Sequence, residues 1–174
     1  MRSTQLTLGG VRPEIAAGDS DSWCTPEWIV ELVRACFDGV IDLDPCSNAG
    51  SIVYARINWT LEHNGDRPWG PRKVYVNGPY SNPDWWMARS AECLRSGGEV
   101  IALPKLDPST KWWRHTRSAA AMCLLNRRVR FDRPDGAPAG ASNFPSALVL
   151  WSTDQRRVEG FSKLWAPHGD VWTR

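Results

Sequence analysis

Short apolar strands alternate with helical segments along most of this chain, and that alternation constrains its fold more than any other feature. Three segments have apolar residues at helical spacing: 26–37, 82–95 and 110–118. Six others are apolar almost throughout and predict strands: 40–44, 73–77, 99–103, 121–125, 128–131 and 147–151. Such strands are typical of parallel sheets that are covered on both faces. We therefore predict an α/β fold with a mostly parallel sheet and flanking helices.

The length of 174 residues suits one domain. We expect a loose N-terminal arm at 1–20, the domain at 21–153 and a weakly patterned C-terminal extension at 154–174. No apolar run is long enough to cross a bilayer, and residues 1–18 lack the apolar core of a signal peptide, so we expect a cytoplasmic protein. Five cysteines without a Cys-x-x-Cys pair fit a reducing compartment, and no metal site is predicted.

Polar and turn-forming residues follow three of the predicted strands. They are Asp44-Pro45-Cys46, Asn77-Gly78-Pro79-Tyr80 and Pro104-Lys105. Ligands of parallel α/β sheets bind beyond the carboxyl ends of the strands. At the second of these ends, an Asn amide oxygen and a backbone carbonyl provide two acceptors that suit an exocyclic amino group. Tyr80 provides a ring on which a base can stack. An ordinary loop of turn residues is the alternative interpretation.

Positive charge is concentrated in one part of the chain, although the net charge is only +2. Between residues 105 and 133 the chain has eight Lys and Arg residues against two Asp. Within that stretch, Lys105, Lys111, Arg127, Arg128 and Arg130 are candidates for contacts with DNA phosphates. The alternative is a solvated surface without a partner. Eleven tryptophans, two of them in Trp112-Trp113, also point to exposed aromatic surface that can stack on bases.

The motif at residue 77 resembles the Asn-Pro-Pro-Tyr motif of DNA amino-methyltransferases, with Gly78 in place of the first proline. The resemblance extends over about residues 22–152, because further segments occur in the same order: Trp23-Cys24-Thr25-Pro26, Asp42-Leu43-Asp44-Pro45-Cys46, Trp69-Gly70, Trp85-Trp86, Leu103-Pro104, Trp112-Trp113, 127–131 and Phe144-Pro145. Together they resemble the small phage-type DNA N6-adenine methyltransferases, the Dam-like enzymes of phages and prophages.

This resemblance implies a trimmed, Rossmann-like fold that binds S-adenosylmethionine. It implies that the methionine end of the cofactor is held by Thr25, Pro26, Asp44, Pro45 and Cys46. Asp44 would pair with the ammonium group, and the first N–H groups of the following helix would receive the carboxylate. Asp42 is either a further cofactor contact or an internal hydrogen-bond acceptor. The adenosine half of the cofactor would be held by the loop at 58–70, where Asp66 and Trp69 are candidates for contacts.

The resemblance also implies transfer of a methyl group to the N6 amino group of adenine in DNA. The amino group would donate to Asn77 Oδ1 and the Gly78 carbonyl, while Tyr80 stacks on a flipped base and Pro79 keeps the turn rigid. Two alternatives are a catalytically silent relative that binds DNA or cofactor, and a cytosine-N4 methyltransferase. Restoring proline at Gly78 is expected to keep or raise activity, provided that the local backbone permits it.

Overall fold

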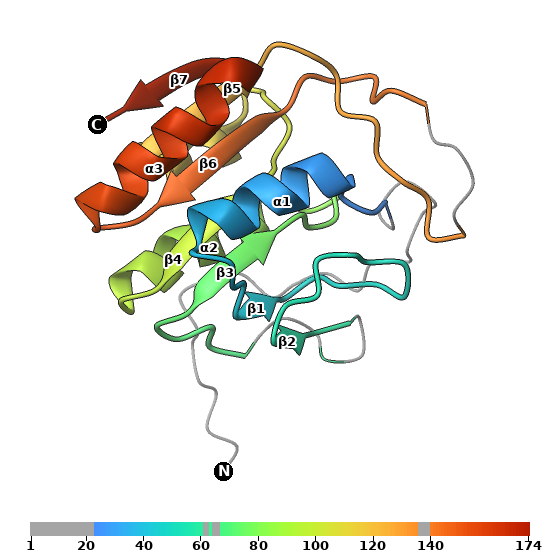
Figure 1. Ribbon diagram of the computed structural model, residues 1–174, viewed down its shortest axis with the longest axis horizontal. Helices are drawn as coiled ribbons and strands as arrows, with labels where there is room; N and C mark the ends of the chain where they lie inside the picture. Colours follow the sequence, from blue (N-terminus) through green and yellow to red (C-terminus); the bar gives the residue numbers. More distant parts are fainter. Residues whose placement is uncertain (1–22, 61–62, 64–66, 136–139) are drawn as a thin grey trace.

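A computed structural model describes residues 23–60, 63, 67–135 and 140–174 (Figure 1). The predicted N-terminal arm and Asp66 lie outside the described residues. The strands form one seven-stranded sheet in the order β2-β1-β3-β4-β6-β5-β7. Their bounds are β1 Leu43–Asp44, β2 Ile57–Asn58, β3 Lys73–Val76, β4 Glu99–Ala102, β5 Ala121–Leu125, β6 Ala147–Trp151 and β7 Gly169–Thr173.

The α/β class is confirmed, but a mostly parallel sheet is wrong. Strands β2, β1, β3 and β4 pair in parallel, whereas the β4–β6, β6–β5 and β5–β7 pairs are antiparallel. The apolar pattern could not reveal this reversal. All five residues of β6 are buried, so its sequence looks like that of a parallel strand covered on both faces. The strand predicted at 128–131 is also absent; Arg130 makes only an isolated bridge to Ala141.

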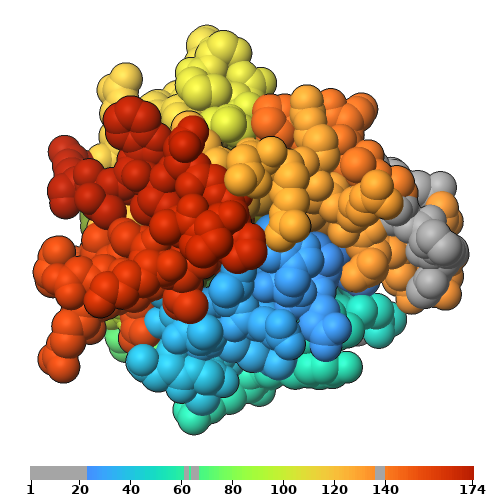
Figure 2. Space-filling model, turned by 45° about the horizontal axis from the view of Figure 1, so that its top comes forward, coloured from blue at the N-terminus to red at the C-terminus, as the bar shows by residue number. Residues whose placement is uncertain are grey.

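Helices cover both faces of the sheet (Figure 1). Helices α1 (Glu27–Cys36) and α3 (Gln155–Trp165) pack side by side on one face, as Figures 1 and 2 show, while α2 (Pro83–Arg95) and the 3₁₀ helix η3 (Lys111–Ser118) pack together on the other. Adjacent residues of a strand point to opposite faces, so Tyr75 joins the α1–α3 core and Val74 and Val76 join the α2–η3 core. No described helix is long and apolar enough to span a membrane.

The segment from residue 154 onward forms a helix and a strand that belong to the same layers. Asp154 caps α3, because its Oδ1 accepts the backbone N–H of Arg156 at 2.9 Å. Val158, Phe161 and Trp165 of α3 are buried, and β7 pairs with β5 over its whole length. A short 3₁₀ helix, η4 (Ala166–His168), joins the two elements. The Asp154 cap and the i, i+3, i+7 spacing of Val158, Phe161 and Trp165 are sequence signals of a helix. The expectation of a weakly patterned segment did not take them into account.

One arginine of this segment, Arg157, contacts residues at the end of α1 and at the start of β4. The Arg157 guanidinium donates to Asp38 Oδ2 at 2.9 Å, to Glu99 Oε1 at 3.3 Å and to the carbonyl oxygen of Cys36. Hydrogen bonds from Arg157 and Lys73 lower the pKa of Asp38 to about 2. The same guanidinium therefore connects α3 to the end of α1 and to the start of β4.

Candidate functional site

The carboxyl ends of β1, β3 and β4 meet at one edge of the sheet, because these three strands are adjacent and parallel. Asp44 is the last residue of β1, and Asn77 and Lys105 lie in the segments that follow β3 and β4. The start of α1 lies at the same edge, since Thr25 contacts both Tyr75 and Asn77. The fold thus brings together the three strand ends that the sequence analysis singled out.

The Asn77 side chain is held by residues that precede α1. Its Nδ2 donates to Thr25 Oγ1 at 3.1 Å and to the Trp23 carbonyl at 3.4 Å. Its Oδ1 accepts from the Tyr80 hydroxyl at 3.3 Å. Both donors are directed at the residues before α1, and the amide oxygen, which has two lone pairs, can accept a second hydrogen bond beside that from Tyr80. Thr25 therefore orients Asn77; it does not cap α1, whose N-cap is Pro26 without a side-chain cap.

Tyr80 is packed among aromatic and cationic neighbours. Its ring lies edge-on to Phe144 and Phe131, with centroid distances of 4.8 and 6.0 Å. Lys105 Nζ lies 5.2 Å from the centre of the Tyr80 ring and 4.5 Å from that of Phe144. Burial strongly raises the pKa of the Tyr80 hydroxyl, with a further contribution from Cys46, so this group stays a neutral hydrogen-bond donor.

Position 78 requires a glycine because there is no room for a Cβ atom, and not because of its backbone conformation. A Cβ at this position would lie 2.5 to 2.6 Å from three atoms of the Trp86 indole ring, and Trp86 is buried. The adjoining cavity, lined by Gly78, Pro79 and Tyr80 among others, has a volume of only about 10 Å³. A base therefore needs neighbouring side chains to move before it can reach the ring of Tyr80. Lys105 is the long, flexible side chain that covers that ring.

We predict that Gly78→Pro and Gly78→Ala both destabilise the protein, which reverses the expectation from the motif alone. Either change pushes a Cβ into the Trp86 ring, and overpacking of this kind costs about 1–3 kcal/mol. Thermal melts should show lower midpoints for both variants than for the control Ser81→Ala, an exposed position. Placing Gly78→Pro in a Trp86→Leu background should cost less than in the wild type. A wild-type midpoint for Gly78→Ala would contradict this explanation.

Asp44 is a buried carboxylate that makes no ion pair with a described residue. It accepts the backbone N–H of Cys46 at 3.1 Å and the Ser51 hydroxyl at 3.4 Å, and it also receives a hydrogen bond from Ser47. Burial raises its pKa from 3.8 to about 6, and these hydrogen bonds only partly offset the effect. An unpaired buried acid at the end of a parallel strand is suited to a cationic ligand group.

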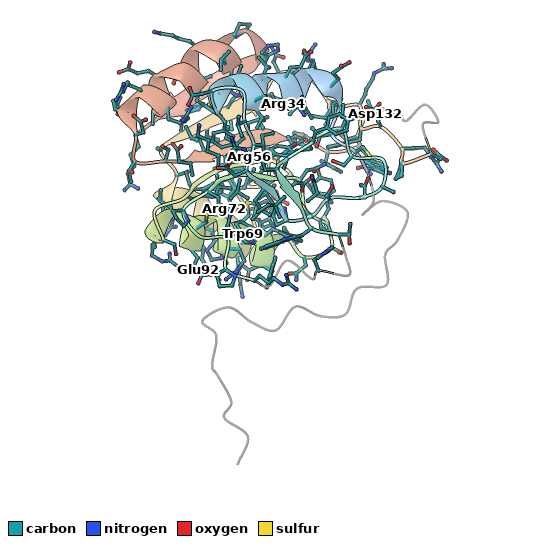
Figure 3. The ribbon with its side chains drawn as sticks, turned by 60° about the horizontal axis from the view of Figure 1, so that its bottom comes forward. Arg34, Arg56, Trp69, Arg72, Glu92 and Asp132 are labelled. Carbon is teal, nitrogen blue, oxygen red and sulfur yellow. The ribbon has the colours of Figure 1, made fainter. Side chains whose placement is uncertain are left out.

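Asp42 lies two residues earlier but serves a different purpose. Its Oδ2 accepts the Lys73 backbone N–H at 3.0 Å, and its Oδ1 lies 3.5 Å from the Arg56 guanidinium. These contacts fit the alternative of an internal hydrogen-bond acceptor. Trp69 is also part of the fold: it is buried, stacks on Trp86 at 6.4 Å and lies beside Arg72, which donates to its carbonyl (Figure 3).

The predicted DNA-binding residues do not form one cluster. Lys105 lies over Tyr80, whereas Lys111 begins η3 on the other face of the sheet. Arg127 follows β5, and its guanidinium carbon lies 4.2 Å from the centre of the Trp28 ring of α1. Arg128 and Arg130 are exposed in the loop that follows. The residues that sequence reasoning missed are the neighbours of the motif: Tyr75, Trp86, Phe131 and Phe144 as packing partners, and Ser51 beside Asp44.

The site belongs to an α/β domain with its polar chemistry at the carboxyl edge of a parallel half-sheet. A family model described as DNA N-6-adenine-methyltransferase (Dam) matches residues 13–164. A DNA N-6-adenine-methyltransferase of Haemophilus phage HP1 (strain HP1c1) is 28% identical over 137 residues, covering 76% of this chain and 79% of that protein. One of Escherichia phage T1 is 28% identical over 102 residues, covering 58% of this chain and 42% of that protein. No solved structure matches.

The chain therefore belongs to the DNA N-6-adenine-methyltransferase (Dam) family. The resemblance in its motifs is confirmed, and adenine-N6 methylation of DNA is the activity that this membership supports. Neither a silent relative nor a cytosine-N4 enzyme is favoured.

Proposed function

We propose that this protein transfers a methyl group from S-adenosylmethionine to the N6 amino group of adenine in DNA, using Asn77, Gly78, Pro79 and Tyr80. The observation that carries the proposal is the fixed orientation of the Asn77 amide. Its nitrogen donates to Thr25 and Trp23, and its oxygen accepts from the hydroxyl of Tyr80, the residue on whose ring a base would stack. We also propose that the domain has a trimmed methyltransferase fold, built on the parallel half of the sheet. The protein is proposed to act in the cytoplasm of a bacterial host.

In this mechanism the protein positions the amino group rather than deprotonating it. Adenine N6 is a weak nucleophile because its lone pair is delocalised into the ring. Donation of both N–H groups, to Asn77 Oδ1 and to the Gly78 carbonyl, favours a pyramidal nitrogen whose lone pair is directed at the methyl group. The new N–C bond forms as the C–S bond breaks, and an N6 proton then leaves to solvent. Bound S-adenosylmethionine supplies the methyl group on a positively charged sulfur.

DNA contacts are proposed for Lys105, Lys111, Arg127, Arg128 and Arg130. Lys105 combines two tasks in this scheme. It covers the Tyr80 and Phe144 rings in the structure, and it would exchange them for a phosphate of the flipped nucleotide when the base enters. Its backbone bridges to Ser146, so only the side chain has to move.

The test of the activity is mass spectrometry of nucleosides from DNA that has been incubated with the protein and S-adenosylmethionine. We expect N6-methyladenine in the wild-type reaction and none with Asn77→Ala. N4-methylcytosine would favour the cytosine alternative. No methylated nucleoside, from a protein that still binds DNA, would favour the silent relative.

The methionine end of the cofactor is proposed to bind between Asp44 and the start of α1, with Thr25, Pro26, Pro45 and Cys46 forming the wall. The buried Asp44 fits an ammonium group because no described cation neutralises it. The dipole of α1 suits a carboxylate at its N-terminus. For Asp42 the contacts with Lys73 and Arg56 favour the role of an internal hydrogen-bond acceptor over that of a cofactor contact.

We predict that cofactor affinity falls as the pH drops below about 6, because protonation of Asp44 removes its charge. Asp44→Asn should weaken calorimetric binding at pH 7.5 by about tenfold or more, about 1.4 kcal/mol, and should flatten the pH dependence. The pKa of Asp44 is raised on folding, so its ionisation costs stability as the pH rises through 6, and ligand-free Asp44→Asn should melt higher than wild type at pH 7.5. Asp42→Asn is the matched control, and equal weakening by both changes would refute the assignment.

A further inference from the structure

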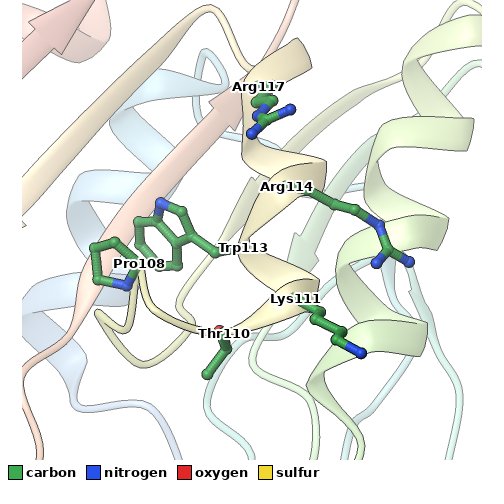
Figure 4. Close-up of a pocket in the computed structure, with 6 residues that line it drawn as sticks. All are labelled: Pro108, Thr110, Lys111, Trp113, Arg114 and Arg117. Atoms are coloured by element: carbon green, nitrogen blue, oxygen red, sulfur yellow. The ribbon is translucent and has the colours of Figure 1, made fainter.

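A surface pocket on η3 contains two cations, Arg114 and Arg117, that have no role in the function proposed above. It has a volume of about 300 Å³ and is lined by Pro108, Thr110, Lys111, Trp113, Arg114 and Arg117 (Figure 4). None of these residues lines the cavity at Gly78, Pro79 and Tyr80. Of the six, the sequence analysis assigned only Lys111 to DNA. The pocket is therefore a separate feature of the face that carries α2.

The three cations of this pocket are brought into line by the type of helix on which they lie. Lys111, Arg114 and Arg117 are three residues apart, and η3 is a 3₁₀ helix over all eight of its residues. A 3₁₀ helix has three residues per turn and a rise of about 2 Å per residue, so residues three apart lie above one another, about 6 Å apart. We call these residues the η3 basic row. In an α-helix, with 3.6 residues per turn, each of these residues would be offset by about 60° around the axis from the one before.

The buried residues of η3 pack against the rest of the protein, and this packing fixes the position of the η3 basic row. Trp112 and Thr116 are buried, Trp112 packs in the core between α2 and the sheet, and the Trp151 indole donates to Ser118 Oγ at 3.1 Å. Trp113 is only partly buried, and Pro108 lies beside it on the side of η3 away from α2 (Figure 4). The pocket thus combines a row of cations with a small apolar wall.

The charge of the row is only weakly compensated. Among the described residues, neither Lys111 nor Arg117 forms an ion pair, and η3 itself contains no acidic residue. Arg114 lies 3.5 Å from Asp84, and both side chains are more than half exposed. Exposed pairs of this kind are weak and screened by salt, so Arg114 can exchange Asp84 for another anion. Aligned like charges repel one another, which makes a purely structural role for the row unfavourable.

We propose that the η3 basic row binds the phosphodiester backbone of the DNA substrate at a position flanking the target base, with Trp113 and Pro108 packing against a deoxyribose. This inference rests on the proposed function for the identity of the polymer. Phosphates follow one another at about 3.4 Å along the axis of each strand, so cations about 6 Å apart can reach successive or alternate phosphates. The chain also links the two places directly, because Pro108 lies three residues beyond Lys105, which covers Tyr80.

The experiment compares two triple variants of the full chain on the same 30-base-pair duplex over a range of salt concentrations. The first, Lys111→Gln with Arg114→Gln and Arg117→Gln, removes the row and keeps much of each side-chain stem. The matched control, Arg95→Gln with Arg156→Gln and Lys163→Gln, removes three exposed cations from other helices. We expect the first variant to bind at least about tenfold more weakly at low salt, with a salt slope smaller by about 2 to 3. We expect a smaller change for the control and unchanged cofactor affinity for both.

The possible results separate this inference from the proposed function. Equal effects of the two triple variants, or an unchanged salt slope, would overturn the inference even if the wild type methylates adenine. Tighter row-dependent binding to single-stranded RNA than to duplex DNA would overturn the choice of polymer. Row-dependent DNA binding by a protein that methylates nothing would support the η3 site and contradict the proposed function.

Discussion

Asn77→Ala is expected to lower the rate of methyl transfer by about 100-fold or more while changing DNA affinity much less. The amide oxygen is one of two acceptors proposed for the N6 amino group, and removal of one preorganised polar group from an active site typically costs about 10²–10³ in rate. Its effect should fall on kcat rather than on KM, because the interaction strengthens only as the nitrogen becomes pyramidal. The measurement is transfer from labelled cofactor to duplex DNA, with Ser81→Ala as the control and thermal melts to check folding.

Two further variants separate the role of the amide oxygen from that of its orientation. Thr25→Val removes the acceptor that holds Asn77 Nδ2 at 3.1 Å, so it should lower kcat by an intermediate amount. Thr25→Ser keeps the hydroxyl and should restore most of the rate.

Tyr80→Phe should retain base stacking, whereas Tyr80→Ala should lose about 1–3 kcal/mol of it. Near-wild-type turnover in Asn77→Ala would refute the proposed mechanism.

The sequence predicted that the strand ends at Asp44 and Asn77 would lie together, because that placement depends on local signals. Strands β3 and β4 are short apolar runs, helices α1 and α2 have apolar residues at helical spacing, and parallel neighbours must end at the same edge. Asp44 and Asn77 therefore lie at one edge of the sheet, as expected. What periodicity could not predict was the direction of β6, which is fully buried in either arrangement, or the two-residue strand β2.

The immediate neighbours of the motif depend on long-range contacts that no local pattern encodes. The clash that requires Gly78 arises from the rotamer of Trp86, and Phe131 and Phe144 reach Tyr80 from a loop about 50 residues or more away. The same limit applies to charge. The basic residues between 105 and 133 are close in sequence, but η3 and the segment after β5 lie on different faces of the sheet. Only the fold shows that they form more than one surface.

Removal of residues 154–174 is expected to abolish folding, even though this segment lies outside the motifs that define the family resemblance. The deletion takes away α3, with the buried side chains of Phe161 and Trp165, and leaves β5 without its partner β7. Loss of one large buried aromatic side chain costs about 3–5 kcal/mol. Two of them together consume most of the roughly 5–15 kcal/mol by which a domain is stable. Residues 1–153 should therefore be insoluble or lack a cooperative melt.

Arg157→Met provides a graded test of the same segment, because it preserves the length of the chain. Methionine retains much of the apolar stem but removes the donor to the Cys36 carbonyl and one of the two donors to Glu99, whose Oε1 also accepts from the Ser152 hydroxyl. The side chain of Arg157 is only 9% exposed, so the loss should cost about 1–3 kcal/mol and lower the melting midpoint by several degrees. Arg156→Met, one residue earlier and exposed, should have little effect. If residues 1–153 melt cooperatively and bind cofactor, α3 and β7 are an extension that the domain does not need.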